Sequence, residues 1–254
     1  MNITYTIKHR WQLLIALLQT NVIKTIWFNF KMLPSRQAIK LPIFIYKNVH
    51  FRDLSGKIVV NNARYGMIKI GYSSHYVATS IPGSEWTIRG KLVLNGPTRF
   101  FQGTYLLISD NAALTCGGIY NMFGSGTKII CFNNIIIGKR VDVTWECQII
   151  DTSFHYIGQQ GEELDDIPPL AKEIVIGNYV WIGNRTTISK GAVIPDESII
   201  ASNSLVNKDL SGCGTNCLFA GMPAKVVKEG VRRIWNESDE SVLDKKHDYY
   251  RVHL

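Results

Sequence analysis

The sequence predicts an all-β solenoid, a parallel β-helix with an N-terminal basic amphipathic helical segment and a C-terminal capping helix. Three observations support this fold class. The chain has a repeat of six residues, a second column of small side chains in the same register, and a composition of 46% hydrophobic and 19% charged residues over 254 positions. Such a composition is typical of a folded globular protein, and it excludes a disordered, collagen-like or coiled-coil chain.

The repeat is clearest from Ile174 onward, where the chain divides into the blocks IVIGNY, VWIGNR, TTISKG, AVIPDE, SIIASN and SLVNKD. The third residue of each block is aliphatic, and the residue four positions later is small or β-branched. A strict period of six cannot come from a helix, whose period is 3.6 residues. It indicates short strands joined by tight turns, three strands to a coil, with stacked coils that bury one aliphatic column. The aliphatic column is Ile176, Ile182, Ile188, Ile194, Ile200 and Val206, and the small column is Val180, Thr186, Ala192, Ser198 and Ser204.

Weaker copies of the register occur upstream, as far back as Ile70, so we assign residues 58–220 to the solenoid. The aliphatic column stops at Ile149 and resumes at Ile176. The intervening residues 152–172 are rich in Gly, Pro and acidic side chains, which predicts a loop that leaves the coil. Long loops inside compact domains are commonly functional.

The two ends differ from the solenoid. Residues 1–57 hold nine Lys and Arg against one acid, so the whole formal net charge of +8 lies in this segment. Residues 8–33 mix these bases with apolar and aromatic side chains, which suits either an anionic membrane surface or packing on the body or on a neighbouring subunit. Polar interruptions argue against a cleavable signal peptide and a spanning helix. In residues 221–254 we expect a helix from Pro223 to about Asn236 that caps the open end of the solenoid, followed by a charged tail.

Cysteine usage and charge distribution narrow the classes of partner. Five cysteines without a C-x-x-C pair indicate reduced thiols and a cytoplasmic protein. Cys213 and Cys217 offer only two of the four ligands that zinc requires, with no histidine nearby in the sequence, so we expect no metal. The bases near the N-terminus are strung among Leu, Ile and Phe without a recognised motif, so we expect no nucleic-acid partner.

His155 stands at the rim of the predicted loop, four residues after Asp151. An imidazole can take a proton from a hydroxyl near neutral pH, and Asp151 or a backbone carbonyl can fix its tautomer through the other ring nitrogen. Position alone is equally compatible with an ordinary surface histidine.

Three further strings carry more specific information, namely residues 137–155 (IGKRVDVTWECQIIDTSFH), 180–183 (VWIG) and 221–225 (GMPAK). Together with the repeats, they make the chain resemble the hexapeptide-repeat (left-handed β-helix) acyltransferases. Within that family the chain is most similar to the branch of maltose, galactoside and xenobiotic acetyltransferases and the O-acetyltransferases of bacterial surface polysaccharides. The resemblance covers about residues 130–230 and leaves the N-terminal segment outside.

The resemblance implies a left-handed β-helix and a homotrimer whose site lies in the groove between neighbouring solenoids. It also implies that His155 is the general base for direct attack of an acceptor hydroxyl on the thioester of acetyl-CoA, with backbone N–H groups stabilising the oxyanion and no metal. Asp151 is the candidate catalytic partner of His155. The residues that match the acetyl-CoA groove of the family are Trp181, Gly183, Asn184, Ser202, Asn207, Lys208, Lys225 and Lys228.

The acceptor stays open at this level. We expect an O-acetyltransferase of a sugar or glycan precursor, working in the cytosol or at the inner face of the membrane. N-acetylation of an amino sugar, or acetylation of a xenobiotic or amino acid, would use the same histidine. Asn121 is the nearest candidate for the acceptor-binding asparagine of the family, and it is out of register with it. Two other classes are a non-enzymatic β-helix scaffold and a metal-dependent hydratase of the γ-carbonic anhydrase kind, which needs three histidine ligands.

Overall fold

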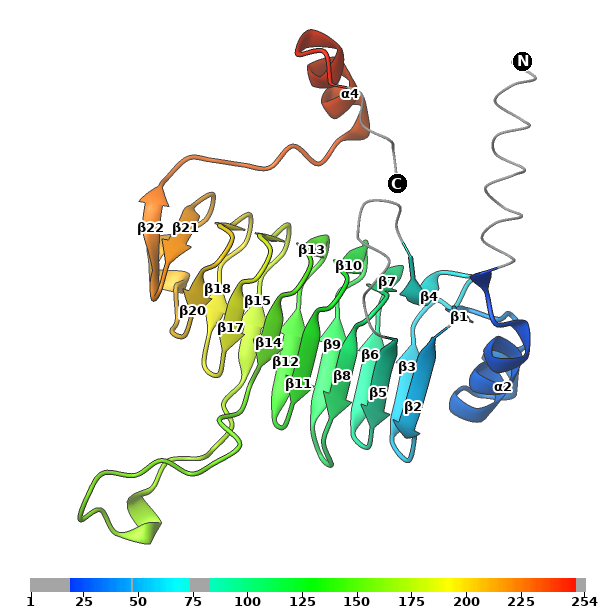
Figure 1. The fold of residues 1–254 in the computed structure, drawn as a ribbon, viewed down its shortest axis with the longest axis horizontal. Coiled ribbons are helices and arrows are strands. Elements are labelled where there is room, and N and C mark those ends of the chain that lie inside the picture. Colours follow the sequence, from blue (N-terminus) through cyan, green and yellow to red (C-terminus); the bar gives the residue numbers. More distant parts are fainter. Residues whose placement is uncertain (1–18, 47, 74–82, 250–254) are drawn as a thin grey trace.

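The computed structural model describes residues 19–46, 48–73 and 83–249, and Figure 1 shows their coils stacked into a solenoid. Sheets of nine, seven and six strands form its three sides, and successive strands pass from one sheet to the next. The strands pair in parallel, apart from the antiparallel pair at the C-terminal end of the nine-stranded sheet. The prediction of an all-β parallel solenoid is confirmed.

The nine-stranded sheet runs in the order β1 (Ile43–Ile45), β4 (Ile68–Tyr72), β7 (Thr98–Phe101), β10 (Asn121–Phe123), β13 (Val141–Val143), β16 (Trp181–Ile182), β19 (Ile199–Ile200), β21 (Leu218–Gly221) and β22 (Ala224–Lys228). The seven-stranded sheet contains β2 (Val49–Asp53), β5 (Ser84–Ile88), β8 (Tyr105–Ile108), β11 (Lys128–Cys131), β14 (Gln148–Ile150), β17 (Thr187–Ser189) and β20 (Leu205–Val206). The six-stranded sheet contains β3 (Lys57–Val60), β6 (Lys91–Leu94), β9 (Ala113–Cys116), β12 (Asn134–Ile137), β15 (Ile174–Ile176) and β18 (Val193–Ile194).

Both columns of the repeat point into the solenoid. The six aliphatic residues from Ile176 to Val206 are at most 1% exposed, and the small residues between them are buried as well. The small residues sit where one side turns into the next, and their hydroxyls bond to turn carbonyls. Thr186 donates to the carbonyl of Ala201 at 3.0 Å, and Ser198 donates to that of Pro195 at 2.7 Å. At Thr186 and Ser198 a small hydroxyl side chain therefore completes the hydrogen bonding of a tight bend, whereas Val180 and Ala192 only fill the buried space.

Close stacking of turns explains the glycines of the repeat. A Cβ atom on Gly183 would lie 2.5 Å from the backbone nitrogen of Ser202 in the next coil, and one on Gly177 would lie 2.7 Å from the backbone nitrogen of Asp196. Backbone atoms cannot yield at such distances without moving a whole coil. Only glycine lets the two turns approach this closely.

The solenoid begins one coil earlier than the predicted residue 58. The strands β1 and β2 pair in register with β4 and β5, and their inward residues Ile43, Ile45 and Val49 are fully buried. The outward residues His50 and Arg52 are exposed. Their basic character made this stretch look like part of the charged segment, because an alternation over so few residues is weak in sequence.

The helices α2 (Val22–Met32) and α3 (Ser35–Ala38) precede β1. Helix α2 packs on the first coil through Phe28, which is fully buried and stacks on the ring of Phe51 with centroids 4.6 Å apart. The described part of the amphipathic segment therefore packs on the body of the protein, and residues 8–18 lie outside the described residues.

Side chains of α2 also complete the hydrogen bonds of β1, the edge strand. Asn29 donates to the carbonyl of Ile43 at 2.7 Å, and the backbone N–H of Ile45 donates to the hydroxyl of Thr25 at 3.0 Å. An edge strand whose polar groups are covered in this way offers no template for pairing. Of the helices in the described ranges, none has the length and apolarity to cross a membrane.

The helix predicted from Pro223 to about Asn236 is wrong. The chain instead forms β22, antiparallel to β21, and then a C-terminal arm over residues 229–236. The helix α4 (Glu237–Lys246) follows, with the side chain of Asn236 accepting from the backbone N–H of Ser238. The free edge of β21 explains the difference, because its unpaired backbone groups favour a strand over a helix. Figure 1 shows α4 beside the solenoid rather than over its open end, so this helix does not cap it.

A loop projects from the stack of coils between β14 and β15 (Figure 1). An isolated bridge between Thr152 and Ala171 closes its base, and the short turn η1 (Leu164–Asp166) lies in its projecting part. A second short turn, η2 (Ser211–Cys213), connects β20 to β21. The loop joins two coils that stack directly, since β12 pairs with β15 on the other side of it.

Candidate functional site

The predicted site residues lie on two edges of the solenoid. We call the turns from the nine-stranded to the seven-stranded sheet the first corner, and the turns from the seven-stranded to the six-stranded sheet the second corner. His155 belongs to the second corner, because the loop that carries it follows β14. Gly183, Asn184 and Ser202 belong to the first corner, because they follow β16 and β19. One chain therefore does not bring these residues together in a single pocket.

His155 is exposed near the base of the loop. The hydroxyl of Ser153 donates to the carbonyl oxygen of His155 at 2.8 Å, and the ring of Phe154 packs edge-on against Phe132 at 5.5 Å. These contacts fix the backbone around His155. No hydrogen bond of the imidazole itself occurs among the residues that the structure describes.

Asp151 does not act on His155 in the way the sequence suggested. Its side chain is fully buried, and its two oxygens accept from the backbone N–H groups of Phe132 at 2.7 Å and Asn133 at 2.8 Å. Burial raises the pKa of this carboxyl, and the N–H groups act against that rise. The carboxylate fixes the turn that carries Phe132, which in turn packs on Phe154. Asp151 is thus a positioning residue for the loop base rather than a direct partner of the imidazole.

Lys190 contacts the loop base that carries His155, and the sequence reasoning missed it. It lies one coil above the loop base, after β17, and its ammonium donates to the hydroxyl of Ser153 at 3.0 Å and to the carbonyl of Leu170 at 3.3 Å. Both ends of the loop are therefore tied to the same cation. The signal in the sequence was a lysine in the turn of the TTISKG block, which also suits a solvated surface charge.

The first corner forms a continuous polar edge beside Trp181. The hydroxyl of Ser202 donates to the side-chain oxygen of Asn184 at 2.6 Å, which links two stacked turns. Trp181 points outward from β16 and is half-buried. Its neighbours in register are Asp142 on β13 and Ile199 on β19. The corner therefore combines an indole face with polar groups from two coils.

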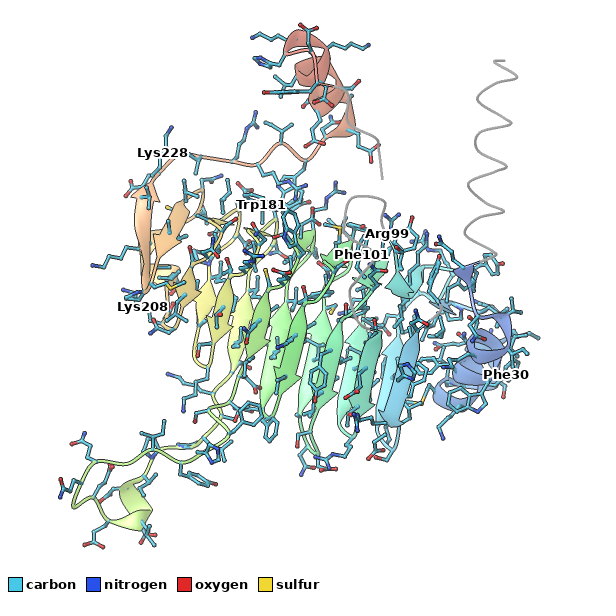
Figure 2. All side chains as sticks on the ribbon, viewed as in Figure 1. Phe30, Arg99, Phe101, Trp181, Lys208 and Lys228 are labelled. Atoms are coloured by element: carbon cyan, nitrogen blue, oxygen red, sulfur yellow. The ribbon has the colours of Figure 1, made fainter. Side chains whose placement is uncertain are left out.

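The remaining predicted residues lie toward the C-terminal end of the solenoid. Asn207 and Lys208 are exposed at the second corner, two coils beyond the loop base, which is about 10 Å at the usual strand spacing. Lys225 and Lys228 are exposed on β22. Figure 2 shows Lys208, Lys228 and Trp181 at separate places, with Lys208 and Lys228 near the C-terminal end of the solenoid.

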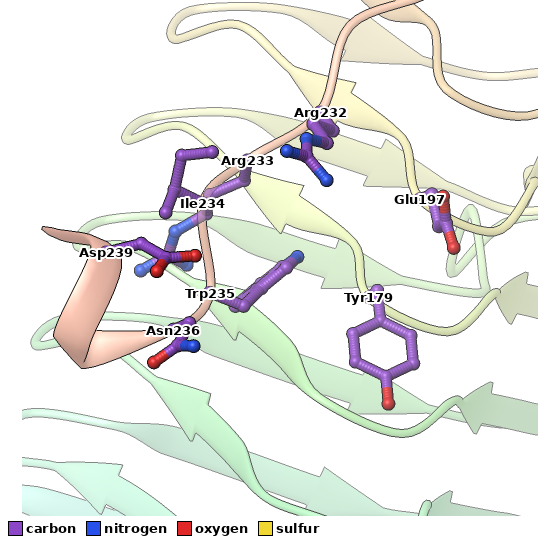
Figure 3. A pocket seen from close by; sticks show the side chains of 8 residues that line it. All are labelled: Tyr179, Glu197, Arg232, Arg233, Ile234, Trp235, Asn236 and Asp239. Carbon is purple, nitrogen blue, oxygen red and sulfur yellow. The ribbon is translucent and has the colours of Figure 1, made fainter.

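A hollow of about 300 Å³ lies between the C-terminal arm and the solenoid. Figure 3 shows Trp235 of the arm and Tyr179 of the coil among its lining side chains, with ring centroids 6.2 Å apart. None of the predicted site residues lines this hollow. It is formed by the arm and is separate from both corners.

The described parts of the chain contain no cluster of three or more His, Cys, Asp or Glu side chains that would hold a metal ion. His75 lies outside the described residues. The five cysteines are free thiols. Burial raises the pKa of Cys116 to about 12, so this thiol is neutral and unreactive at physiological pH.

Comparison with known proteins adds to this geometry. No protein-family model matches the chain. Over 165 residues the chain is 37% identical to the probable macrolide acetyltransferase of Lysinibacillus sphaericus, a match that spans 59% of this chain and 84% of that protein. The chain belongs to the hexapeptide-repeat acyltransferase family. It is therefore an enzyme of the acyltransferase class, as the sequence predicted, and the scaffold alternative is excluded.

Other proteins are also similar to this chain. The galactoside O-acetyltransferase of Escherichia coli (strain K12) is 43% identical over 97 residues, which span 38% of this chain and 42% of that protein. An uncharacterized 24.8 kDa protein in the cps region of Klebsiella pneumoniae is 32% identical over 80% of this chain and 86% of its own length. Among solved structures, the polySia-specific acetyltransferase NeuO has a TM-score of 0.48 at 18% identity, covering 79% of this chain and 96% of that one.

Proposed function

We propose that this acyltransferase is an acetyl-CoA-dependent O-acetyltransferase that acts on a hydroxyl of a sugar or glycan precursor, with His155 as general base. The observation that carries the proposal is the open imidazole of His155 on a loop base held by Ser153, Lys190 and the Phe154 ring contact. Three relatives are named for O-acetylation of galactoside, polysialic acid or lipopolysaccharide. The chain spans less than half the length of each of these three proteins.

The proposed reaction needs one proton carrier. The imidazole of His155 takes the proton of the acceptor hydroxyl while the hydroxyl oxygen attacks the thioester carbon of acetyl-CoA. The C–S bond then breaks, and the imidazolium returns its proton to the leaving thiolate. The products are an acetyl ester and the free thiol of coenzyme A. Backbone N–H groups at the turns are the donors available for the transient oxyanion.

The distribution of polar and charged residues supports acetyl-CoA as the donor. Lys208, Lys225 and Lys228 offer exposed ammonium groups at one end of the solenoid, which suits the several phosphates of coenzyme A. Trp181 and the Ser202–Asn184 pair offer an apolar face and hydrogen-bonding groups for a long, mixed-polarity arm. A ligand of that length can contact both regions only in a groove that runs along the solenoid axis.

The division of these residues over two corners supports a homotrimer. In a ring of three parallel solenoids, the second corner of one copy faces the first corner of the next. His155 and Lys208 of one chain then share a groove with Trp181, Asn184 and Ser202 of its neighbour. A single chain would hold only half of such a site.

Calorimetric titration with acetyl-CoA, together with sedimentation, tests this function. We expect saturable binding at one site per chain in an assembly of three. With a sugar acceptor found by screening, His155→Ala should lower the rate of transfer about a hundredfold or more while acetyl-CoA binding and the trimer persist. His247→Ala, at the residue that caps the C-terminus of α4, is the matched control and should keep full activity. Absence of acetyl-CoA binding at millimolar concentration contradicts the proposed donor.

A second candidate is acetylation of an amino sugar nitrogen or of a small drug-like molecule. The relative named as a probable macrolide acetyltransferase favours it, because the chain spans 84% of that protein. The same His155 chemistry would serve. Parallel assays on neutral sugars, amino sugars and macrolides separate the two, since the preferred acceptor has the highest kcat/KM.

We further propose that the N-terminal end rests on an anionic membrane at its cytoplasmic face. Helix α2 turns Phe28 inward and leaves Ile23, Trp27 and Phe30 exposed, at 83%, 47% and 53%. Figure 2 shows Phe30 at the end of the molecule opposite to Lys228. Helix α2 carries Lys24 and Lys31 and no acidic side chain, so this apolar patch lies on a positively charged helix.

Vesicle flotation tests this contact. The chain should float with vesicles that contain phosphatidylglycerol and stay behind with neutral phosphatidylcholine vesicles. The double variant Trp27→Ser/Phe30→Ser should weaken the binding about tenfold or more. The matched control is Val242→Ser/Leu243→Ser, which removes two exposed apolar residues from the acidic helix α4. Equal loss in both variants would contradict a specific surface.

A further inference from the structure

A row of cations and aromatic rings lies on the outer side of the nine-stranded sheet, outside the residues assigned to acyl transfer. We call Lys69, Tyr72, Arg99, Tyr120 and Arg140 the cation–aromatic row. The ammonium of Lys69 lies 5.0 Å from the centre of the Tyr72 ring, and the guanidinium of Arg99 lies 5.7 Å from Tyr72 and 5.4 Å from Tyr120. The guanidinium of Arg140 lies 5.8 Å from Tyr120. Each tyrosine ring therefore contacts two cations.

Within the described residues, the three cations of the row have no carboxylate partner. Every Asp and Glu of the sequence lies in the described part of the chain, and the ion pairs found there include neither Lys69 nor Arg99 nor Arg140. The neighbouring carboxylate of Asp142 pairs with Arg233 of the C-terminal arm. Arg140 donates one Nη to a carbonyl of the arm, while its Nε is buried and without an acceptor.

Neighbouring positive charges that are half-buried repel each other and lose hydration. Burial and the charge of Arg99 together lower the pKa of Lys69. The aromatic rings compensate part of this cost, and the side chains of Lys69 and Arg99 donate no hydrogen bond to any other described residue. A counter-anion would remove the repulsion and use these donors, so the arrangement is typical of an anion-binding surface.

The spacing of the row shows what kind of anion fits. Lys69 on β4 is aligned with Arg99 on β7, and Arg140 precedes β13, two strands further along the sheet. At about 4.8 Å per strand, the row extends about 14 Å parallel to the solenoid axis. A single carboxylate or phosphate cannot contact all three cations. An extended polymer with regularly spaced charges can.

We propose that the cation–aromatic row binds an acidic glycan chain whose sugar carboxylates pair with Lys69, Arg99 and Arg140. The proposal rests on the function proposed above and names the acceptor class as an acidic glycan. The row also points toward the proposed groove, because the outward register that contains Arg99 continues through Asp142 to Trp181. Figure 2 shows Arg99 and Trp181 along the same edge of the solenoid. A chain held on the row would thus run alongside the proposed acyl-transfer groove.

Two other occupants fit less well. Single-stranded nucleic acid stacks its bases on free aromatic faces, whereas both tyrosine rings of the row already hold cations. The acidic part of the projecting loop, residues 162–166, extends from β14 toward the C-terminal end of the solenoid (Figure 1). In a ring of parallel solenoids equal coils face each other, so this part of a neighbour's loop would lie away from Lys69 and Arg99, which are on earlier coils.

Calorimetry with a short oligogalacturonate tests the proposal, since this probe carries one carboxylate on each sugar. A neutral oligosaccharide of the same length and an oligonucleotide are the comparison ligands. The wild-type chain should bind the oligogalacturonate, with an affinity that falls as salt is added, and should bind the neutral sugar much more weakly. The variant Lys69→Gln/Arg99→Gln should lose tenfold to a hundredfold in affinity. The charge-conserving variant Lys69→Arg/Arg99→Lys should stay within a few fold of wild type.

The chain offers a matched control on another side. Lys57 and Lys91 are exposed register partners on β3 and β6 of the six-stranded sheet, so Lys57→Gln/Lys91→Gln removes the same charge from two adjacent strands. This control should bind the probe within twofold of wild type. The proposal is overturned if both double variants lose the same affinity for the oligogalacturonate. It is also overturned if the wild-type chain binds the neutral sugar equally well or prefers the oligonucleotide. Dissociation of the oligomer in Lys69→Gln/Arg99→Gln overturns it as well, because the row would then be a subunit contact. Acetyl-CoA binding, measured in the same samples, reports on the proposed transferase function independently.

Discussion

The coils before the projecting loop contain more residues than the coils after it, and their strands are longer. After the loop, Trp181 pairs with Ile199 and Thr187 pairs with Leu205, so one coil takes 18 residues. Before the loop, Asn121 pairs with Val141, 20 residues on. The strands also differ, with two or three residues each from β15 to β20 and up to five in the earlier coils. We call residues 43–149 the wide coils and residues 174–206 the narrow coils.

The interiors of the two regions differ accordingly. The wide coils are filled by a stack of aromatic rings, in which Phe100 lies 4.8 Å from both Trp86 and Phe123. The narrow coils hold only the aliphatic and small columns. The comparison teaches that a strict repeat gives regular corners suited to a long ligand. The wide coils, whose repeat is less strict, hold large aromatic side chains inside and carry the cation–aromatic row outside.

Removing an aromatic ring from the wide coils is the most damaging change we expect within the solenoid. Phe123→Ala should lower the free energy of unfolding by about 3–5 kcal/mol, because the adjacent coils are held in place by backbone pairing and cannot close over the cavity. Ile188→Val in the narrow coils should cost about 0.5–1.5 kcal/mol. Equilibrium urea unfolding measures both values. Similar losses at the two sites would erase the distinction between the regions.

The narrow coils should matter for catalysis through Lys190. Lys190→Met removes the cation that ties Ser153 to Leu170, so the loop base loosens while the acetyl-CoA groove persists. We expect kcat to fall about tenfold with little change in the KM for acetyl-CoA. Lys190→Arg should recover most of the rate. Lys128→Met, an exposed lysine on β11, is the matched control, and an equal effect there would contradict the positioning role.

Alkaline pH should weaken the wide coils first. Burial raises the pKa of Tyr46 from 10.0 to about 12. The unfolded chain releases this proton at lower pH than the folded one, so stability is intact below pH 10 and is lost as the pH rises toward about 12. The melting temperature should fall over that window, and it should fall less in Tyr46→Phe. An unchanged alkaline slope in Tyr46→Phe would assign the effect elsewhere.

Some features of the site could be predicted from the sequence, because they depend on residues that are close together along the chain. The repeat places Ile176 and Val180 inside, and the break at Ile149 predicts the loop that carries His155. The role of Asp151 could not be predicted from the sequence, because its hydrogen-bond partners are backbone N–H groups at residues 132 and 133, in the preceding coil. The C-terminal strand was missed for a related reason, since β22 exists only beside the free edge of β21.

The sequence by itself determined the solenoid, its narrow coils and the exposed histidine at the loop, because a period of six residues decides locally which side chains face inward. Only the tertiary structure decided which distant residues meet. Lys69 and Arg99 align, and Arg140 lies two residues before Asp142 of the same register, although the coils differ in length, from 30 residues between Ile68 and Thr98 to 20 between Asn121 and Val141. Such variable spacing has no period in sequence. The physical reason is that backbone pairing between coils sets this alignment, whatever the length of the turns between them.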